Sequence, residues 1–161
     1  MSQVVLVEPR GDWDARYEAW RARLCGLVPH ATVDHIGSTA VPDMMAKDVI
    51  DILVGVDGDA VAVTADVLED AGLDVDGRRG GHCWLSASRN GARETVIHVM
   101  VRGSAPWCDR LRFRDLLRAE EHVRAQYLDL KQALAAQGLD WSAYTAAKAG
   151  FVRAALASTF R

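Results

Sequence analysis

Apolar and polar residues follow two different periods along this chain, and the period indicates which segments form strands and which form helices. Short apolar runs at 4–7, 32–36 and 49–56 are typical of buried β-strands, and the last resembles a strand that is covered on both faces. Between the first two runs, large apolar residues recur every three or four positions, at Trp13, Tyr17, Trp20 and Leu24. This spacing predicts an amphipathic helix that begins after Asp12 and ends at Pro29.

The middle of the chain predicts a helix followed by further strands. Residues 59–71 have a helical pattern that ends at Gly72. Strand-like runs follow at 73–75, 83–87 and 95–101, separated by Gly-Arg-Arg-Gly-Gly and by Arg-Asn-Gly-Ala-Arg. The Asn-Gly pair in the second separator is typical of a β-hairpin turn.

From residue 107 onward, turn-forming residues are few and the pattern is helical. We expect helices over 107–117, 120–137 and 141–160, with a break at the Gly138-Leu139-Asp140 junction. The order of elements is therefore mixed α/β first and helical last. It predicts one α+β domain over residues 1–161, in which a mixed β-sheet packs against helices and the C-terminal part is helical.

The composition narrows the class of protein. The chain has 161 residues and a mass of 17.6 kDa, half of its residues are apolar, and its formal net charge is -3. These values exclude a disordered chain and a general binder of polyanions, and no RNA-binding motif is present, so we expect no nucleic-acid partner. Three widely separated cysteines, and the lack of an apolar run long enough to span a bilayer, predict a cytoplasmic protein without disulfides or membrane contact.

The first candidate for chemistry is the Gly37-Ser38-Thr39 triplet, which follows the predicted strand 32–36. A glycine lets the backbone approach a ligand closely, and hydroxyls beside main-chain N–H groups favour a phosphate or another oxyanion. The same triplet is also typical of a plain turn or a helix cap. Lys47 lies between this turn and the next strand, so it is the cation best placed to complement a phosphate.

Asp51 is the second candidate, because it stands at the centre of the apolar run 49–56. A carboxylate there needs a partner, which is either a metal ion or a structural partner such as an arginine or loop amides. Two-metal chemistry needs two acids that lie two residues apart on one face of a strand. The residue two positions after Asp51 is Leu53, which is not an acid. Asp48 can join Asp51 as a metal ligand only if the chain is still a loop at that point.

His98 and Arg114 complete the candidate set. His98, in the strand-like run 95–101, is either a general base or metal ligand near Asp51, or a hydrogen-bonded histidine in a half-buried cleft. Arg114 shares a helical face with Arg118, where it either binds a phosphate or belongs to a salt-bridged, solvated surface. Aromatic residues of the helices recur at spacings typical of core packing, among them Trp13, Trp20, Trp141, Tyr127 and Tyr144.

Several segments together resemble one known family. They are His35-Ile-Gly-Ser-Thr-Ala-Val-Pro42, Ala46-Lys47, Ile50-Asp-Ile-Leu-Val54, the run 93–99, Phe113-Arg-Asp-Leu-Leu-Arg-Ala119, Tyr127-Leu-Asp-Leu-Lys131 and Tyr144-Thr-Ala-Ala-Lys148. In this combination the chain resembles the GrpB family, which belongs to the nucleotidyltransferase superfamily by fold. The resemblance covers nearly the full chain.

The resemblance implies a site in which Gly37 and Ser38 hold the phosphates of a nucleotide while Asp51 binds Mg²⁺, the implied cofactor. Our leading hypothesis is a protein that binds a nucleotide or a phosphorylated metabolite and, if active, transfers a nucleotidyl or phosphoryl group. In this hypothesis His98 acts as base or metal ligand, and Lys47 and Arg114 complement the substrate.

Two alternatives from other classes remain open. In the first, the same cleft has lost catalysis and serves as a ligand-binding or regulatory module, which the missing second acid favours. In the second, the protein is a tailoring enzyme in which Asp43 and Asp48 recognise a cationic amine.

Overall fold

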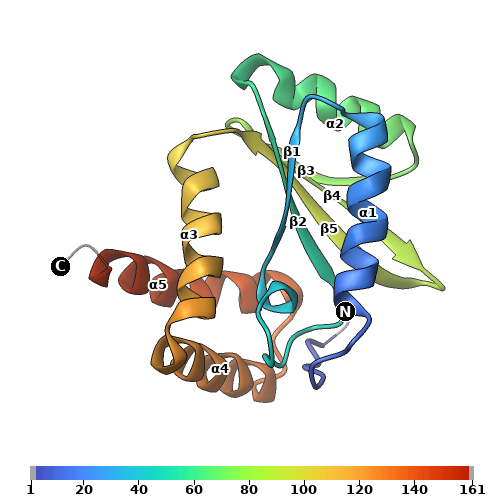
Figure 1. The fold of residues 1–161 in the computed structure, drawn as a ribbon. Helices are drawn as coiled ribbons and strands as arrows, with labels where there is room; N and C mark the ends of the chain where they lie inside the picture. Colours follow the sequence, from blue (N-terminus) through green and yellow to red (C-terminus); the bar gives the residue numbers. More distant parts are fainter. Residues whose placement is uncertain (1–2, 160–161) are drawn as a thin grey trace.

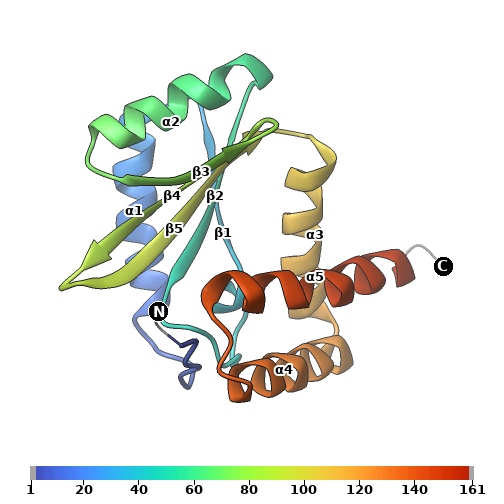
Figure 2. The ribbon, with the colours of Figure 1, turned by 180° about the vertical axis from the view of Figure 1, so that it is seen from behind.

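The computed structural model describes residues 3–159 as a five-stranded β-sheet with helices on both faces (Figures 1 and 2). Two of the elements, η1 and η2, are short 3₁₀ helices. Along the chain the elements are α1 (Trp13–Leu27), β1 (Thr32–Ile36), η1 (Ser38–Ala40), β2 (Ile50–Val56), η2 (Gly58–Ala60), α2 (Val61–Asp70), β3 (Asp74–Arg79), β4 (His82–Arg89), β5 (Ala92–Val101), α3 (Ala105–Ala119), α4 (Glu121–Ala136) and α5 (Trp141–Ser158). This order confirms the α+β class with a helical C-terminal part.

The sheet is mixed, with the strand order β1-β2-β5-β4-β3. Neighbouring strands are antiparallel except β2 and β5, which are parallel. The register places Asp51 beside Ile36 at the end of β1 and beside Val96 of β5, and it pairs Leu53 with His98 two residues further along. Since paired residues share a face of a sheet, Asp51, Leu53 and His98 all point to the same side.

The two faces of the sheet are covered by different helices. On one face, α1 and α2 pack on the strands in the main apolar core, which includes Trp13, Trp20, Leu24, Ile50, Ile52, Val54, Leu68 and Ile97. On the other face, Trp107 and Leu111 of α3 pack on Ile36, Leu53 and Met100. The strand β2 is therefore buried from both sides, which explains its nearly continuous apolar sequence.

The helical C-terminal part packs on the loop that follows η1. Val41 and Met44 of this loop share an apolar cluster with residues of α3, α4 and α5, among them Leu117, Val123, Tyr127 and Ala155. Figures 1 and 2 show α4 and α5 together at the end of the sheet where β1 ends and β2 begins. This packing brings segments that are far apart in the sequence to one place.

The predicted strand at residues 4–7 is wrong. Only Val7 pairs with another segment, through an isolated bridge to Ala46, and no regular strand forms. Val4 instead packs on Leu134 of α4 and Tyr144 of α5. A short apolar run suits packing against helices as well as pairing in a sheet, and here the helices supply the contacts.

The boundaries around β3 also differ from the prediction. The strand extends to Arg79, so the turn to β4 is only Gly80-Gly81 rather than the whole Gly-Arg-Arg-Gly-Gly segment. Arg78 stays in the strand while its guanidinium reaches Asp66 of α2 at 2.7 Å. The Gly-Arg-Arg-Gly-Gly segment was expected to separate two strands, but the ion pair of Arg78 with the adjacent helix accommodates this arginine within β3 at the sheet edge.

The hairpin turn and the C-terminal helices are confirmed. Asn90 and Gly91 both have positive φ, at 52° and 78°, as a two-residue hairpin turn between β4 and β5 requires. Asp140 caps α5 by accepting a hydrogen bond from the Ala143 N–H at 2.8 Å. The predicted last helix runs to Phe160, which lies outside the described residues.

Candidate functional site

The turn after β1 brings the backbone against the Asp51 side chain. Gly37 has φ 73° and ψ -173°, and a Cβ atom at this position would lie 2.7 Å from Asp51 Oδ2. Any residue other than glycine would be strained in this backbone conformation, because its β-carbon would collide with the carboxylate. The predicted proximity of Gly37, Ser38 and Asp51 is present in the structure.

Thr39 holds this turn to the opposite side of the sheet. Its Oγ1 is 2.9 Å from His35 Nε2, and the His35 ring stacks on Tyr17 of α1 with ring centroids 4.6 Å apart. Burial lowers the pKa of His35 to about 4, so its imidazole is neutral at physiological pH. The conformation of the turn is therefore coupled to α1 through a neutral hydrogen bond.

A small cavity of about 60 Å³ opens at this turn. It is lined by the predicted residues Gly37, Ser38, Thr39, Lys47 and Asp51. It is also lined by Ala46 and Val49 of the preceding loop, Tyr127 and Lys131 of α4, and Tyr144 and Lys148 of α5. We call it the lysine pocket, because Lys47, Lys131 and Lys148 are the only lysines in the sequence and all of them line it.

The three ammonium groups have different partners. Lys131, which is 2% exposed, donates to Ser38 Oγ at 2.9 Å and to the Met45 carbonyl oxygen. Lys47 lies 3.0 Å from the centre of the Trp141 ring, and Lys148 lies 4.3 Å from the centre of the Tyr144 ring. Lys131 thus joins α4 to the Gly-Ser turn, whereas Lys47 and Lys148 rest on aromatic faces.

Burial makes these lysines costly to charge. It lowers the pKa of Lys47 and of Lys131 to about 7, and it lowers the pKa of Lys148 as well. Neighbouring ammonium groups add to the effect on Lys47 and Lys131, while Asp51 opposes it. An anion bound among them would reverse the effect, because it stabilises the protonated form.

Tyr144 offers a further hydrogen-bond donor in the lysine pocket. Its side chain is 1% exposed, and its hydroxyl has no hydrogen-bond partner among the residues that the structure describes. A buried hydroxyl without a partner is costly unless a ligand or a water molecule completes its hydrogen bonding. The hydroxyl is thus a donor available to a ligand in the pocket.

Asp51 is the only carboxylate among the residues that line the lysine pocket. Burial raises its pKa, and the positive charges of Lys47, Lys148, Arg110 and Arg93 oppose that rise. None of the ion pairs found within residues 3–159 involves Asp51. The carboxylate is therefore not held in an arginine pair, which was one of the two structural alternatives considered from the sequence.

Asp48 does not join Asp51. Its carboxylate accepts hydrogen bonds from Arg10 at 3.1 Å, from Trp13 Nε1 at 2.9 Å and from Arg16. These hydrogen bonds lower its pKa despite partial burial, so it stays ionised as an anchor for α1. In the structure Asp48 binds α1 and the segment before it and does not line the lysine pocket, so its expected role as a metal ligand stays a prediction.

The residues present do not fit a resident divalent ion. Leu53 occupies the position where a second acid would share the face of Asp51, and it is 0% exposed within the apolar cluster under α3. No group of three or more His, Cys, Asp and Glu side chains able to hold a metal exists within residues 3–159. Mg²⁺ prefers oxygen ligands, and this pocket supplies one carboxylate among three ammonium groups.

His98 shares the sheet face of Asp51 but does not line the lysine pocket. Its Nδ1 lies 3.0 Å from Nε2 of His82, which places the two imidazoles in one hydrogen bond. Burial and the nearby Arg110 guanidinium hold the pKa of His98 well below its usual range. The geometry shows the hydrogen-bonded histidine, which was one of the two expected roles.

Arg114 and Arg118 do not line the lysine pocket either. Arg114 Nη1 donates to the His35 carbonyl oxygen at 3.2 Å, and its Nε donates to Asp115 at 2.8 Å. Arg118 Nε donates to the Ala40 carbonyl oxygen at 2.9 Å. Both arginines hold α3 to the ends of β1 and η1, so they support the turn without facing a ligand there.

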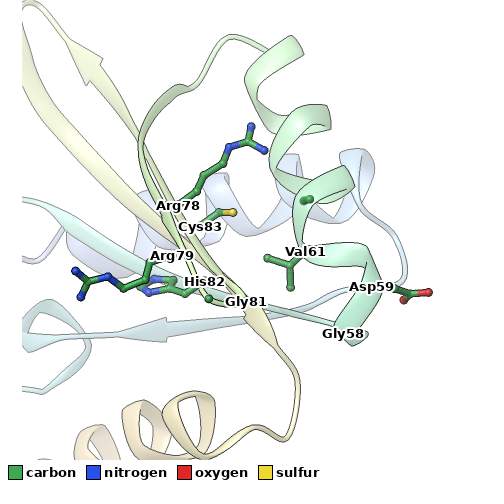
Figure 3. Close-up of a pocket in the computed structure, with 10 residues that line it drawn as sticks. Gly58, Asp59, Val61, Arg78, Arg79, Gly81, His82 and Cys83 are labelled. Carbon is green, nitrogen blue, oxygen red and sulfur yellow. The ribbon is translucent and has the colours of Figure 1, made fainter.

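A second hollow, of about 370 Å³, lies between the start of α2 and the β3–β4 turn (Figure 3). It is larger than the lysine pocket but shallow and open, and its wall includes Gly58, Val61, Gly81 and Cys83. In Figure 3 the Arg78 side chain reaches toward α2, where Asp66 and Glu69 bind it, and the Arg79 side chain points away from the hollow. Asp59 and Arg79 also line this hollow, so it carries charges of both signs and has no cluster of cations like that of the lysine pocket.

Sequence reasoning missed the contribution of the two C-terminal helices to the site. Tyr127 and Lys131, like Tyr144 and Lys148, are four residues apart, so each pair shares one helical face. The tyrosines were interpreted as packing, and Tyr127 does pack in the core, but both also line the pocket. The sequence did contain a signal for these residues. The chain has only three lysines, and its other basic residues are arginines and histidines.

The fold is similar to that of solved nucleotidyltransferase structures, which gives the class of protein. The solved structure of terminal uridylyl transferase 4 from Trypanosoma brucei with bound dUTP is similar over 84% of this chain and 48% of its own length. The TM-score is 0.59 and the sequence identity is 18%, so this likeness concerns the fold alone. The chain has a nucleotidyltransferase-like fold.

Within this class the chain belongs to the GrpB family. A family model described as GrpB protein matches residues 3–158. The crystal structure of GrpB from Enterococcus faecalis is similar over 98% of this chain and 100% of its own, with a TM-score of 0.81 and 25% identity. A UPF0157 protein of Deinococcus radiodurans is 45% identical over 149 residues, which are 91% of this chain and 78% of the relative. These findings confirm the family expected from the sequence.

Proposed function

We propose that this protein binds a phosphorylated small molecule, with a nucleotide as the first candidate, through phosphate groups seated in the lysine pocket. The observation that carries this proposal is that every lysine of the chain lines one small cavity. Ammonium groups are strong hydrogen-bond donors to phosphate oxygens. Three ammonium groups around a single carboxylate carry excess positive charge, and a bound anion would neutralise it.

The roles of the individual groups follow from their partners. Lys47 and Lys148 rest on aromatic rings, and Tyr144 has an unpartnered hydroxyl, so these three side chains are the proposed direct contacts to phosphate. Lys131 and Ser38 already bind each other at 2.9 Å, and they would fix the position of the turn beneath the ligand. Asp51 would keep the neighbouring ammonium groups in place as a counter-charge.

The size of the cavity limits what enters it. A volume of about 60 Å³ admits a phosphate-sized group rather than a nucleoside. The remainder of a nucleotide would therefore lie outside the pocket. Support for a nucleotide comes from the fold, because the trypanosomal structure with the same fold contains dUTP.

This proposal favours a ligand-binding module over magnesium-dependent transfer. The donors present do not fit a resident Mg²⁺, so no transfer step is derived through one. A location in the cytoplasm is part of the proposal, because Cys25, Cys83 and Cys108 are all free thiols. Within residues 3–159, no helix combines the length and the apolar character needed to cross a membrane.

The test is a calorimetric titration of the protein with inorganic phosphate, inorganic tripolyphosphate, ATP and UTP. Lys148→Met removes one ammonium group from the pocket and keeps the side-chain length, so we expect affinity to fall by about tenfold or more. Arg153→Met, an exposed position on the same helix, is the matched control and should leave affinity unchanged. Failure of all four compounds to bind the wild-type protein would refute the proposal.

A further inference from the structure

We infer that the lysine pocket binds its phosphorylated ligand without a divalent cation, because its ammonium groups supply the positive charge that a metal ion would otherwise bring. This inference rests on the proposed function and concerns the same site. It differs from the hypothesis drawn from the family resemblance, in which Asp51 binds a Mg²⁺ ion and the ion binds the phosphates.

The position that a second metal-binding acid would occupy on β2 is closed. Leu53 is 0% exposed and packs with Ile36, Met100, Trp107 and Leu111. A carboxylate in this position would be buried among apolar side chains without a partner. The apolar cluster also attaches α3 to the sheet, so the local fold depends on the residue that excludes the acid.

Asp48, the acid nearest to Asp51 in the sequence, binds other residues. The Asp48 carboxylate accepts hydrogen bonds from Arg10, Trp13 and Arg16, which ties the loop before β2 to α1. Releasing it toward the pocket would leave Arg16, whose side chain is only 18% exposed, without its ion-pair partner. Asp51 is thus the one acid that a ligand in the lysine pocket meets.

The cations of the pocket are lysines and not arginines. All other basic residues of the chain are arginine or histidine, so lysine is confined to this pocket. An ammonium group is a compact point charge with three donors, whereas a guanidinium is a broad planar fork. A compact charge can approach a phosphate oxygen inside a small cavity much as a metal ion does, and a guanidinium needs more room.

Asp51 has a consistent role in this arrangement. Its negative charge raises the pKa of Lys47 and of Lys148, which means that it favours their protonated forms. Because Asp51 lines the same pocket as the three lysines, it acts as a positioning residue whose charge favours their ammonium forms. A metal ion at Asp51 would instead meet the repulsion of the lysines around it.

Calorimetry with inorganic tripolyphosphate and with ATP, each in EDTA and in excess Mg²⁺, tests this inference. The expected result is wild-type affinity in EDTA at least equal to that in Mg²⁺, since chelation by the metal removes ligand charge. Binding that requires Mg²⁺, or that is about tenfold or more tighter with it, would overturn the inference while leaving phosphate binding intact. Absence of binding in both buffers would instead refute the proposed function.

Two variants sharpen the result. Lys148→Met should lose about tenfold or more of the affinity in EDTA, and Lys148→Arg, which keeps the charge but not its compact form, should recover only part of it. Asp51→Asn should keep most of the affinity for tripolyphosphate in EDTA, because a repelling charge is also removed. A loss confined to the Mg²⁺ buffer in Asp51→Asn would show a metal ligand and overturn the inference. Thermal unfolding of each variant verifies that the fold is intact.

Discussion

At the scale of single residues, the site depends on places where only one kind of side chain fits. Gly37 combines a left-handed backbone with close contact to Asp51, and Leu53 seals the sheet face next to that carboxylate. Neither residue carries a reactive group. Both nevertheless limit the chemistry of the neighbouring Asp51. Gly37 lets the turn contact the Asp51 carboxylate, and Leu53 occupies the position where a second acid would lie beside it.

Replacing Gly37 tests the first of these roles. In Gly37→Ala, the new Cβ would lie 2.7 Å from Asp51 Oδ2 at φ 73°, so we expect a loss of about 1–3 kcal/mol in the free energy of unfolding and loss of tripolyphosphate binding. Urea denaturation and calorimetry measure the two effects. Gly80→Ala is the control, because Gly80 also has positive φ, at 45°, but faces open space. Equal effects of the two substitutions on binding would contradict the steric argument.

The second role is tested by restoring an acid. Leu53→Asp places a carboxylate at a position that is 0% exposed, and we expect it to lower the free energy of unfolding by about 3–5 kcal/mol. Leu53→Met conserves apolar volume and should cost less than about 1.5 kcal/mol. If Leu53→Asp were as stable as the wild type by urea denaturation, the cluster under α3 would not exclude a second acid.

At the scale of elements, the Gly-Ser turn is held from both sides of the sheet. On one side Thr39 binds His35, which stacks on Tyr17 of α1. On the other side Arg114 and Arg118 of α3 donate to backbone carbonyls at the ends of β1 and η1. The turn therefore has a fixed shape before a ligand arrives, which reduces the ordering that binding requires.

Removing the hydroxyl of Thr39 should loosen this attachment. Thr39→Val keeps the shape of the side chain but leaves the buried His35 Nε2 without its partner, so we expect a destabilisation of about 1–3 kcal/mol and weaker phosphate binding. The control is Thr32→Val, because the Thr32 hydroxyl makes only a long contact of 3.5 Å to the Gly55 carbonyl oxygen. Unfolding curves and titration of tripolyphosphate compare the two. Unchanged binding of tripolyphosphate by Thr39→Val would show that the attachment of the turn to α1 does not affect the pocket.

The elements were largely predictable from the sequence, and part of the site was too. Strand and helix periods, the Asn90-Gly91 turn and the position of Gly37 near Asp51 are local properties or follow from adjacent strands. Lys131 could not be placed in this way, since it meets Ser38 across a separation of 93 residues. The Tyr-to-Lys spacing showed that each pair shares a helical face, but not which surface that face meets.

At the scale of the whole molecule, the buried Lys131 and the partly buried Lys47 and Lys148 affect stability through their protonation. Burial lowers the pKa of Lys47 and Lys131 to about 7, whereas an unfolded lysine titrates near about 10.4. Between these values the unfolded chain binds more protons than the folded protein does. Stability without ligand therefore rises with pH across this window, because the folded state no longer has to charge its buried lysines.

Urea denaturation between pH 7 and pH 9, interpreted through the lowered pKa values of Lys47 and Lys131, checks this expectation. We expect the free energy of unfolding to increase by about 2 kcal/mol per pH unit, since each lysine contributes up to about 1.4, and Lys131→Met to reduce the slope by about half. Tripolyphosphate at saturation should flatten the slope as well, and its affinity should fall as pH rises because the ammonium groups lose their protons. A stability that does not rise over this range would show that the lysines remain fully charged in the folded protein.

The sequence by itself determined the class of fold, the GrpB family and the turn beside a strand aspartate, because these depend on local periodicity and on motifs of contiguous residues. Tertiary structure alone decided that Asp48 serves α1, that His98 pairs with His82, and that Leu53 lies sealed under α3. It also decided that all three lysines meet in one cavity. The physical reason is that the partner of a buried charge is set by the packing of distant elements, which no local pattern specifies.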